Sequence, residues 1–291
     1  MVSHDDIEMD GEQIDLIEDL DQAWADFVLR STKVEEFVGG LAFKTVSGHD
    51  YLVRYRTDPD TGKKLFTSLG RRSPQTEREL ATWTAARANN KERLATTKAK
   101  LERLGRMGKA LGLARVPVKL GEILEAFREA NLTTKELRLA GPAALFGYEI
   151  KARDLAARDR FAELGSTVHF VSRELSPTVL RDIRKALAPL DPIEDEISKG
   201  MLRTWLSSGA RVDVLDGSVL HVDDEIDHVQ AVCLNRSGRP VEAIALHPEA
   251  WLDLDDRLDG KWGGARDFVE RRLDRIADPE PEDAAAALRS L

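Results

Sequence analysis

The sequence predicts a protein of the α+β class, in which short strands joined by hairpins pack against amphipathic helices. Apolar, β-branched runs follow one another in the last third of the chain, and 235–239 (Asn-Arg-Ser-Gly-Arg) between two of them is a hairpin signal. Apolar residues also recur at helical spacing in several other segments, most clearly in 118–130. The predicted strands of the last third are 211–215, 219–222, 229–234 and 241–246.

Composition limits the class of protein further. The 291 residues are enough for two domains, and the 42% hydrophobic and 33% charged residues are typical of a globular protein with a charged surface. The net charge of −9 predicts no bulk attraction to nucleic acid, although a local basic patch can still bind it. The single cysteine, Cys233, excludes an intramolecular disulfide and a cysteine zinc site.

The location is expected to be cytoplasmic, without a membrane partner. No window of the sequence approaches the roughly 18 apolar residues that span a bilayer. The N-terminus is acidic and lacks an apolar core, so it does not read as a secretory signal. A reducing compartment also suits the low cysteine content.

Residues 1–30 form an acidic segment, whose first 26 residues contain ten carboxylates and no lysine or arginine. The first dozen residues are expected to be disordered. From Ile14 to about Leu29 apolar residues recur at helical spacing and predict an amphipathic helix. Its acidic face is either solvated or docks on a basic surface of this chain or of a partner.

A basic, β-rich stretch follows. Residues 41–45, 50–56 and 63–68 predict a three-stranded meander, and 58–62 (Asp-Pro-Asp-Thr-Gly) is a strong turn signal. Between Arg54 and Arg115 basic residues outnumber acidic ones by about ten, which suits nucleic acid or an acidic protein as a partner. Because few aromatic residues are interleaved, stacking on single strands is not expected. The alternative is an exposed sheet face that is simply charged. The candidate polyanion-binding residues are Arg54, Arg56, Lys63, Lys64, Arg71 and Arg72.

A long helix is predicted from Ser73-Pro74 to about Leu111, and 118–130 completes a helical hairpin. Four leucines of the long helix fall on a near-heptad seam, which packs either on the neighbouring helix or in a homodimer. They are Leu94, Leu101, Leu104 and Leu111.

The segment 137–150 has the order strand, glycine turn, helix. Residues 137–140 are a short apolar run, Gly141 permits a tight turn, and Pro142 suits the first position of the helix that continues to about Lys151. Free backbone N–H groups and the helix dipole meet at such a turn, so it can hold a phosphate.

Three stretches carry a resemblance to a known family: 68–77 (Ser-Leu-Gly-Arg-Arg-Ser-Pro-Gln-Thr-Glu), 238–240 (Gly-Arg-Pro) and 141–149, in which Gly141, Ala144, Leu145, Tyr148 and Glu149 match. From about Tyr51 to about Ile276 the chain resembles a bacterial family of nucleotidyltransferase-fold proteins. The resemblance implies a mixed sheet flanked by helices, preceded by the small β-meander and the long helical hairpin. It also implies transfer of a nucleotide from an NTP to a hydroxyl acceptor, with Mg²⁺ held by an Asp-x-Asp strand and by a third aspartate.

The site residues follow from this resemblance position by position. Gly141 and Tyr148 are the candidate nucleotide-binding residues, and Asp213 matches the third aspartate as catalytic and metal-binding residue. The Asp-x-Asp pair, however, is replaced by Thr167 and His169, so His169 is the remaining candidate metal ligand beside Asp213. Pro142 also removes a hydroxyl and an N–H from the phosphate turn.

Three functional hypotheses therefore stay open: nucleotidyl transfer, a non-catalytic scaffold that binds nucleic acid or protein through the basic region 54–115, and a structural or dimerising role.

Residues 151–160 are expected to be helical and 264–276 to form one final amphipathic helix. The predicted domains are 1–30 (acidic segment), 31–132 (meander and helical hairpin), 133–276 (nucleotidyltransferase-like domain) and 277–291 (acidic tail).

Overall fold

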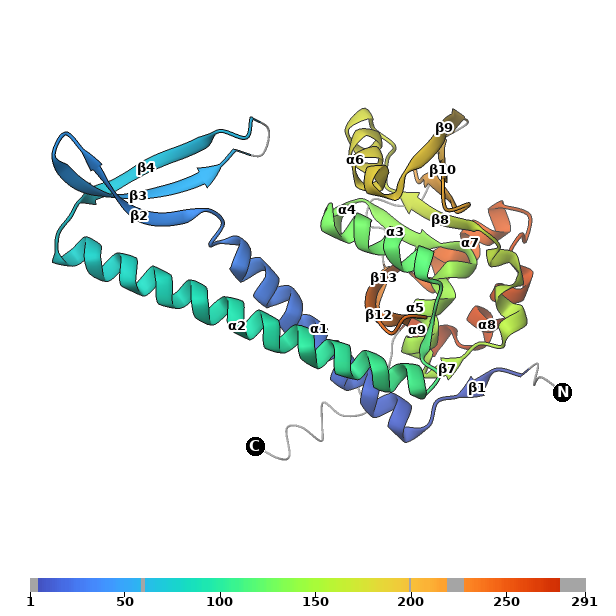
Figure 1. Ribbon diagram of the computed structural model, residues 1–291. Helices are drawn as coiled ribbons and strands as arrows, with labels where there is room; N and C mark the ends of the chain where they lie inside the picture. Colours follow the sequence, from blue (N-terminus) through green and yellow to red (C-terminus); the bar gives the residue numbers. More distant parts are fainter. Residues whose placement is uncertain (1–4, 59–60, 199, 219–227, 278–291) are drawn as a thin grey trace. The chain divides into compact units, whose positions relative to one another are not determined.

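The computed structural model describes residues 5–58, 61–198, 200–218 and 228–277 and shows a mixed α and β protein, as predicted (Figure 1). The chain divides into two compact units. We call residues 1–21 and 104–291 the core unit, and residues 22–103 the meander unit. Two helices, α1 (Gly11–Glu35) and α2 (Pro74–Ala110), contribute residues to both units, so the division differs from the predicted domain ranges.

The core unit contains an eight-stranded mixed sheet. In order across the sheet, its strands are β5 (Ala114–Val116), β12 (His228–Asn235), β13 (Pro240–Leu246), β6 (Leu137–Ala140), β8 (Thr167–Ser172), β11 (Arg211–Asp216), β10 (Met201–Leu206) and β9 (Pro192–Ser198). β8 pairs antiparallel with β6 and parallel with β11. The predicted strands at 211–215, 229–234 and 241–246 are therefore confirmed, whereas 219–222 lies outside the described residues.

Helices and short 3₁₀ segments surround this sheet. Ser176 caps one helix by accepting a hydrogen bond from the Val179 N–H at 3.4 Å, and Phe127 of another helix meets Phe170 of β8 edge-on at 5.0 Å. The elements are α3 (Val118–Glu129), α4 (Leu132–Lys135), η1 (Gly141–Ala144), α5 (Leu145–Ala152), η2 (Arg158–Leu164), α6 (Pro177–Leu187), η3 (Ala188–Leu190), α7 (Pro248–Arg257), α8 (Gly263–Arg271) and α9 (Leu273–Ala277).

The beginning of the chain is ordered where it is described, against expectation. β1 (Ile7–Glu8) pairs antiparallel with β7 (Asp154–Leu155), and Met9 is buried. β7 also shows that 151–160 is not one helix. Arg153 adopts a left-handed conformation (φ 55°) that ends α5, and the chain then pairs with β1 instead of continuing the helix.

The predicted helix 264–276 is interrupted at Arg272. This residue has φ −127°, outside the helical range, and its side chain pairs with Asp6 and Asp154. The segment 193–207, to which the sequence assigns no element, is the antiparallel pair β9 and β10. None of the helices in the described ranges combines the length and the apolar character needed to cross a bilayer.

The meander unit contains the predicted three-stranded antiparallel sheet, formed by β2 (Gly40–Val46), β3 (His49–Thr57) and β4 (Lys64–Arg71). Ser47 and Gly48 both have positive φ, which suits the two-residue turn between β2 and β3. In the same unit the Thr97 hydroxyl of α2 donates to Asp26 of α1 at 2.6 Å. Of the predicted leucine seam, Leu101 and Leu104 are buried within the single chain.

Candidate functional site

A row of side chains crosses the core sheet on one face. The register places Asp213 of β11 between His169 of β8 and Arg203 of β10. Ala140 of β6 lies opposite His169, and Glu196 of β9 lies opposite Arg203. Residues that face each other in register point to the same side of a sheet. We call these five residues the Asp213 row.

Two guanidinium groups surround the Asp213 carboxylate, which is 2% exposed. Arg211 Nη2 donates to Asp213 Oδ2 at 3.1 Å, and Arg211 Nε lies 2.9 Å from Oδ1. Arg203 Nε lies 3.9 Å from Oδ2. Burial raises the pKa of Asp213 above its ordinary value, and the two arginines oppose this shift.

His169 is buried beside Asp213 and is neutral at pH 7. Burial lowers its pKa to about 4, and the nearby charges of Lys261 and Arg211 act in the same direction. Its ring lies 5.6 Å from that of Trp262, which stands at the start of α8. In the described part of the chain, neither ring nitrogen of His169 nor Trp262 Nε1 has a hydrogen-bond partner.

Gly141 lies next to His169. Its φ of +62° favours glycine, and a Cβ there would stand 3.0 Å from His169 Nδ1 and 3.2 Å from the Trp262 ring. Trp251 Nε1 donates to the Gly141 carbonyl at 2.9 Å. All four residues of η1 are buried, so the turn is packed against aromatic rings and is not open to a phosphate from solvent.

Tyr148 lies inside the core. Its side chain is fully buried, and its hydroxyl donates to the Leu246 carbonyl at 2.7 Å. A role of Tyr148 at a nucleotide stays a prediction, while its visible role is to join α5 to β13. The neighbouring Glu149 is buried as well; burial raises its pKa to about 8, although Arg115 lies 3.1 Å away and opposes the shift.

The Asp213 row suits an anion better than a divalent cation. Magnesium prefers several carboxylate oxygens, but here Asp213 faces two arginines, and Glu196, the second carboxylate of the row, lies 3.6 Å from Arg203 Nη1. Within the described ranges no three His, Cys, Asp or Glu side chains form a group that could hold a metal. The side chains of Arg203 and Arg211 are 34% and 32% exposed, so their guanidinium groups can reach a phosphate at the surface.

Sequence reasoning missed three residues of this site. Arg211 could have been found, because it stands two positions before Asp213 on the same strand and so faces the same side. Arg203 lies on β10, in a segment without a predicted strand. Trp262 lies between two helices and meets His169 only through the tertiary fold, so no local pattern reveals it.

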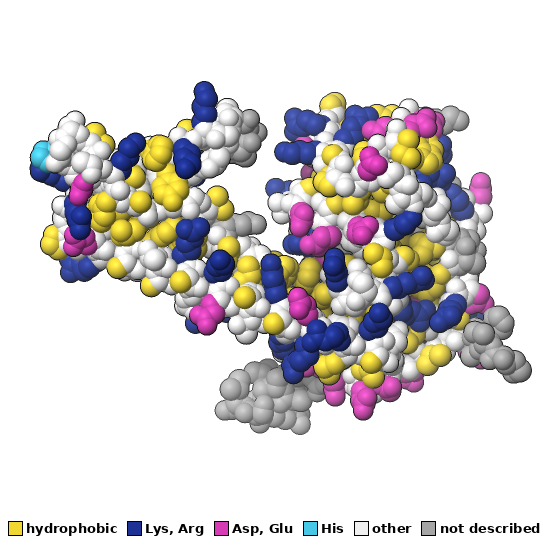
Figure 2. Space-filling model, viewed as in Figure 1, with side chains coloured by type: hydrophobic (Ala, Val, Ile, Leu, Met, Phe, Trp, Pro, Cys, Tyr) yellow, Lys and Arg dark blue, Asp and Glu magenta, His cyan; other side chains and the backbone are white. Residues whose placement is uncertain are grey.

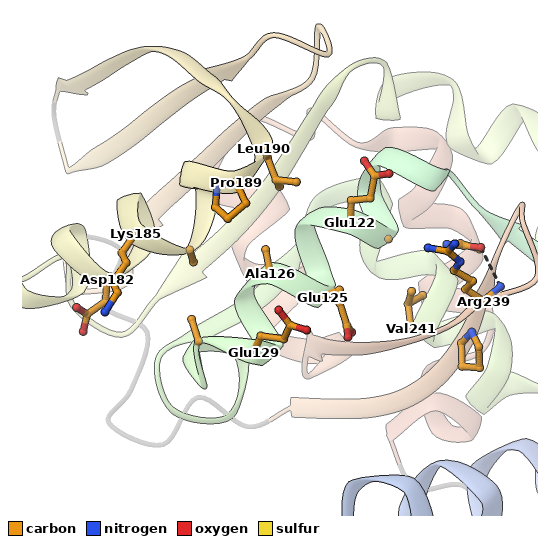
Figure 3. A pocket seen from close by; sticks show the side chains of 15 residues that line it. Glu122, Glu125, Ala126, Glu129, Asp182, Lys185, Pro189, Leu190, Arg239 and Val241 are labelled. Carbon is orange, nitrogen blue, oxygen red and sulfur yellow. Dashed lines mark hydrogen bonds between the residues drawn. The ribbon is translucent and has the colours of Figure 1, made fainter. Parts of the chain in front are cut away.

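A groove of about 760 Å³ lies elsewhere on the core unit, between α3, α6 and the β12–β13 hairpin. It is lined by Glu122, Glu125 and Glu129 of α3, with Lys185 and Arg239 also at its wall (Figure 3). α3 packs on the Phe170 side of β8, opposite to the side of His169. Because these glutamates repel phosphate, the groove does not suit an anionic ligand.

The six candidate polyanion-binding residues are all exposed on the meander unit. Three of them contact neighbours within the unit. Arg54 donates to the Glu36 carbonyl at 3.0 Å, Arg71 Nη2 lies 2.8 Å from His49 Nδ1, and Arg72 pairs with Asp50 and Glu77. The other three, Arg56, Lys63 and Lys64, gather near the end of the β3–β4 pair. Figure 2 shows Lys and Arg side chains around a hydrophobic patch on this sheet.

Comparisons of the chain with models of protein families, with curated proteins and with solved structures gave no match. The functional assignment therefore rests on the geometry of the Asp213 row and on the charge and exposure of the meander sheet.

Proposed function

We propose that the core unit is a nucleotidyltransferase-like module that binds a nucleoside triphosphate through arginines, without the metal pair that nucleotidyl transfer uses. The observation that carries this proposal is the position of Arg211 and Arg203 around the buried Asp213 carboxylate. In this proposal the two arginine side chains supply the positive charge that the resemblance assigns to divalent cations.

The chemistry of Arg203 and Arg211 beside Asp213 supports an anionic ligand. A guanidinium group offers several N–H donors in a plane and binds phosphate oxygens in pairs. Asp213 orients Arg211 by accepting its hydrogen bond and leaves other donors of the guanidinium for a ligand. Lys261 adds a third positive charge close enough to act on both His169 and Asp213.

Strand topology agrees with the same proposal. Gly141, His169 and Asp213 are 28 and 44 positions apart in the sequence, yet they meet on β6, β8 and β11 and the turn after β6. Such a convergence supports an inherited nucleotidyltransferase-type site, while the replacement of its carboxylates favours binding over transfer.

The test is the affinity of Arg211→Gln for ATP, measured by calorimetry in EDTA. Loss of a charge-assisted hydrogen bond is worth about 1.5–3 kcal/mol, so we expect affinity to fall about 10- to 150-fold. Arg257→Gln is the matched control, because Arg257 makes an exposed ion pair with Asp253 of the same helix and its loss should leave affinity unchanged. Equal affinities of the two variants would contradict the proposal.

A second function, binding of a polyanion by the meander unit, is favoured by the separation of charge along the chain. Residues 22–103 contain 16 Lys and Arg and 10 Asp and Glu, a net charge of +6. The remainder contains 27 Lys and Arg and 42 Asp and Glu, a net charge of −15. A basic unit in an acidic protein attracts phosphate backbones in a salt-dependent way.

This second function predicts that labelled DNA binds at low salt and is released as salt rises. The double variant Lys63→Ala and Lys64→Ala should lower the slope of log K against log salt by about one to two, because each phosphate contact contributes roughly 0.7–0.9. Fluorescence anisotropy over a salt series measures the slope. Failure of the wild type to bind at low salt would exclude this function.

A further inference from the structure

An aromatic pair lies on one face of the meander sheet, with Phe66 exposed and Tyr55 half-buried. Phe66 on β4 is 51% exposed and stands opposite Tyr55 on β3, with ring centroids 6.2 Å apart. Lys44 Nζ lies 4.5 Å from the centre of the Phe66 ring, and Lys64 Nζ lies 5.9 Å from that of Tyr55. Two rings and two ammonium groups therefore share one small surface.

The face is open along the β4 side. Side chains alternate between the two faces along β4. The side of Tyr55 therefore carries Lys64, Phe66 and Ser68, and the other face carries Leu65 and Thr67. All three are exposed, and β4 is an edge strand. An aromatic ring half exposed on an edge strand adds little to the core, so packing alone does not explain it.

We propose that this face binds single-stranded nucleic acid, with bases stacked on Tyr55 and Phe66 and phosphates held by Lys44 and Lys64. The inference rests on the polyanion binding proposed for the meander unit and names its ligand. Every base has a flat π-face, so an aromatic platform with flanking cations binds unpaired strands largely without regard to sequence. A duplex keeps its bases stacked inside and cannot use the rings in this way.

Phe66 offers the more accessible ring, because it is 51% exposed, whereas Tyr55 is half-buried and its ring lies against Gly40. An ammonium group over an aromatic ring is held by about 0.5–1 kcal/mol at an exposed site, so it can turn from the ring to a phosphate at little loss. The fold also explains why the sequence predicts no stacking. Tyr55 follows Lys44 by 11 positions and Phe66 follows Tyr55 by another 11, so only the strand register brings the three side chains together.

The test compares Phe66→Ala with Leu65→Ala by fluorescence anisotropy. Leu65 is the matched control, because it is 44% exposed on the same strand but points to the other face. The probes are a labelled 20-mer of dT, the same length of rU, a DNA duplex, and heparin as a polyanion without bases. Stacking is worth about 1–3 kcal/mol per base, so Phe66→Ala should weaken dT or rU binding about 5- to 150-fold and heparin binding less than twofold. Leu65→Ala should change each of these affinities less than twofold.

Each outcome separates the inference from the function on which it rests. If Phe66→Ala and Leu65→Ala bind dT and rU equally well while heparin still binds, the stacking face is wrong and polyanion binding stands. If the wild type binds neither heparin nor any nucleic acid, both are wrong. Phe66→Trp is a second measurement: stacking should preserve affinity and quench the new indole fluorescence, and unquenched fluorescence in a saturated complex would contradict the inference.

Discussion

Gly141 lies where any side chain would meet both His169 and Trp262. A methyl group there would approach His169 Nδ1 to 3.0 Å, and the residue holds a left-handed φ of +62°. Gly141→Ala should therefore lower the free energy of unfolding by about 2–4 kcal/mol, since backbone strain and overpacking each contribute 1 kcal/mol or more. Urea denaturation measures the change.

Gly209→Ala is the control for this substitution. Gly209 also has a positive φ, +80°, but a Cβ there meets nothing within 4 Å. Gly209→Ala should therefore lower the free energy of unfolding by the backbone strain alone, about 1–2 kcal/mol. If both variants lost the same stability, the close packing of Gly141 against His169 and Trp262 would be refuted.

His169 predicts an acid-dependent loss of stability. Its folded pKa of about 4 lies below its ordinary value of 6.5. Between these values the unfolded state takes up a proton that the folded state does not, so stability falls as pH drops from 6.5 to 4. The loss reaches at most about 3 kcal/mol. His169→Phe should remove it, which denaturation at pH 7 and pH 4.5 would show; parallel pH dependence in both proteins would argue against a neutral buried histidine.

At the scale of elements, an ion-pair network holds the start of the chain to the core unit. Asp154 of β7 accepts hydrogen bonds from Arg272 and Arg275, and Arg272 Nη1 lies 3.1 Å from Asp6. The Asp6 and Asp154 side chains are both 5% exposed. Removing one charge from a buried set leaves its partners uncompensated.

Asp154→Asn should therefore lower the free energy of unfolding by about 2–4 kcal/mol. Asp253→Asn is the control, because Asp253 makes an exposed pair with Arg257 one helical turn away, and such pairs contribute less than about 1 kcal/mol. Chemical denaturation compares the two. A loss below 1 kcal/mol in Asp154→Asn would show that the network does not anchor β1 and β7.

Local patterns predict most elements and fail where distant contacts decide. The meander and the long helix follow from turn residues, a Ser-Pro start and helical spacing, and they are found within a few residues of the predicted ranges. β7 and the break at Arg272 instead depend on Ile7–Glu8 and on Asp6, which lie more than 140 positions away. No window of sequence contains that information.

At the scale of the whole molecule, the sequence predicts which residues converge more readily than which side chains surround them. The resemblance selects Gly141, His169 and Asp213, and the structure brings them together. That Arg203 faces Asp213 depends on the pairing of β10 with β11, and the packing of the glycine turn depends on Trp262. The four acidic residues Asp223, Asp224, Glu225 and Asp227, which follow the predicted strand 219–222, lie outside the described residues.

The two units differ in net charge and, as we propose, in the ligand that each binds. The core unit offers arginines at one buried carboxylate, whereas the meander unit offers a basic sheet with an aromatic face. A nucleotide and a nucleic acid share phosphate chemistry but differ in size, so competition separates the two sites. ATP at saturation should leave heparin binding to the meander unit largely unchanged, and full displacement of heparin would place both ligands at one site.

The central claim is that Arg211 and Arg203 replace metal ions at the Asp213 row. Calorimetric titration of ATP into the wild type, in EDTA and again in excess Mg²⁺, tests it most directly. We predict binding in EDTA, with an affinity that Mg²⁺ does not increase, because the arginines already provide the positive charge. Binding that appears only with Mg²⁺ and disappears in Asp213→Ala would contradict the claim and support metal-dependent nucleotidyl transfer.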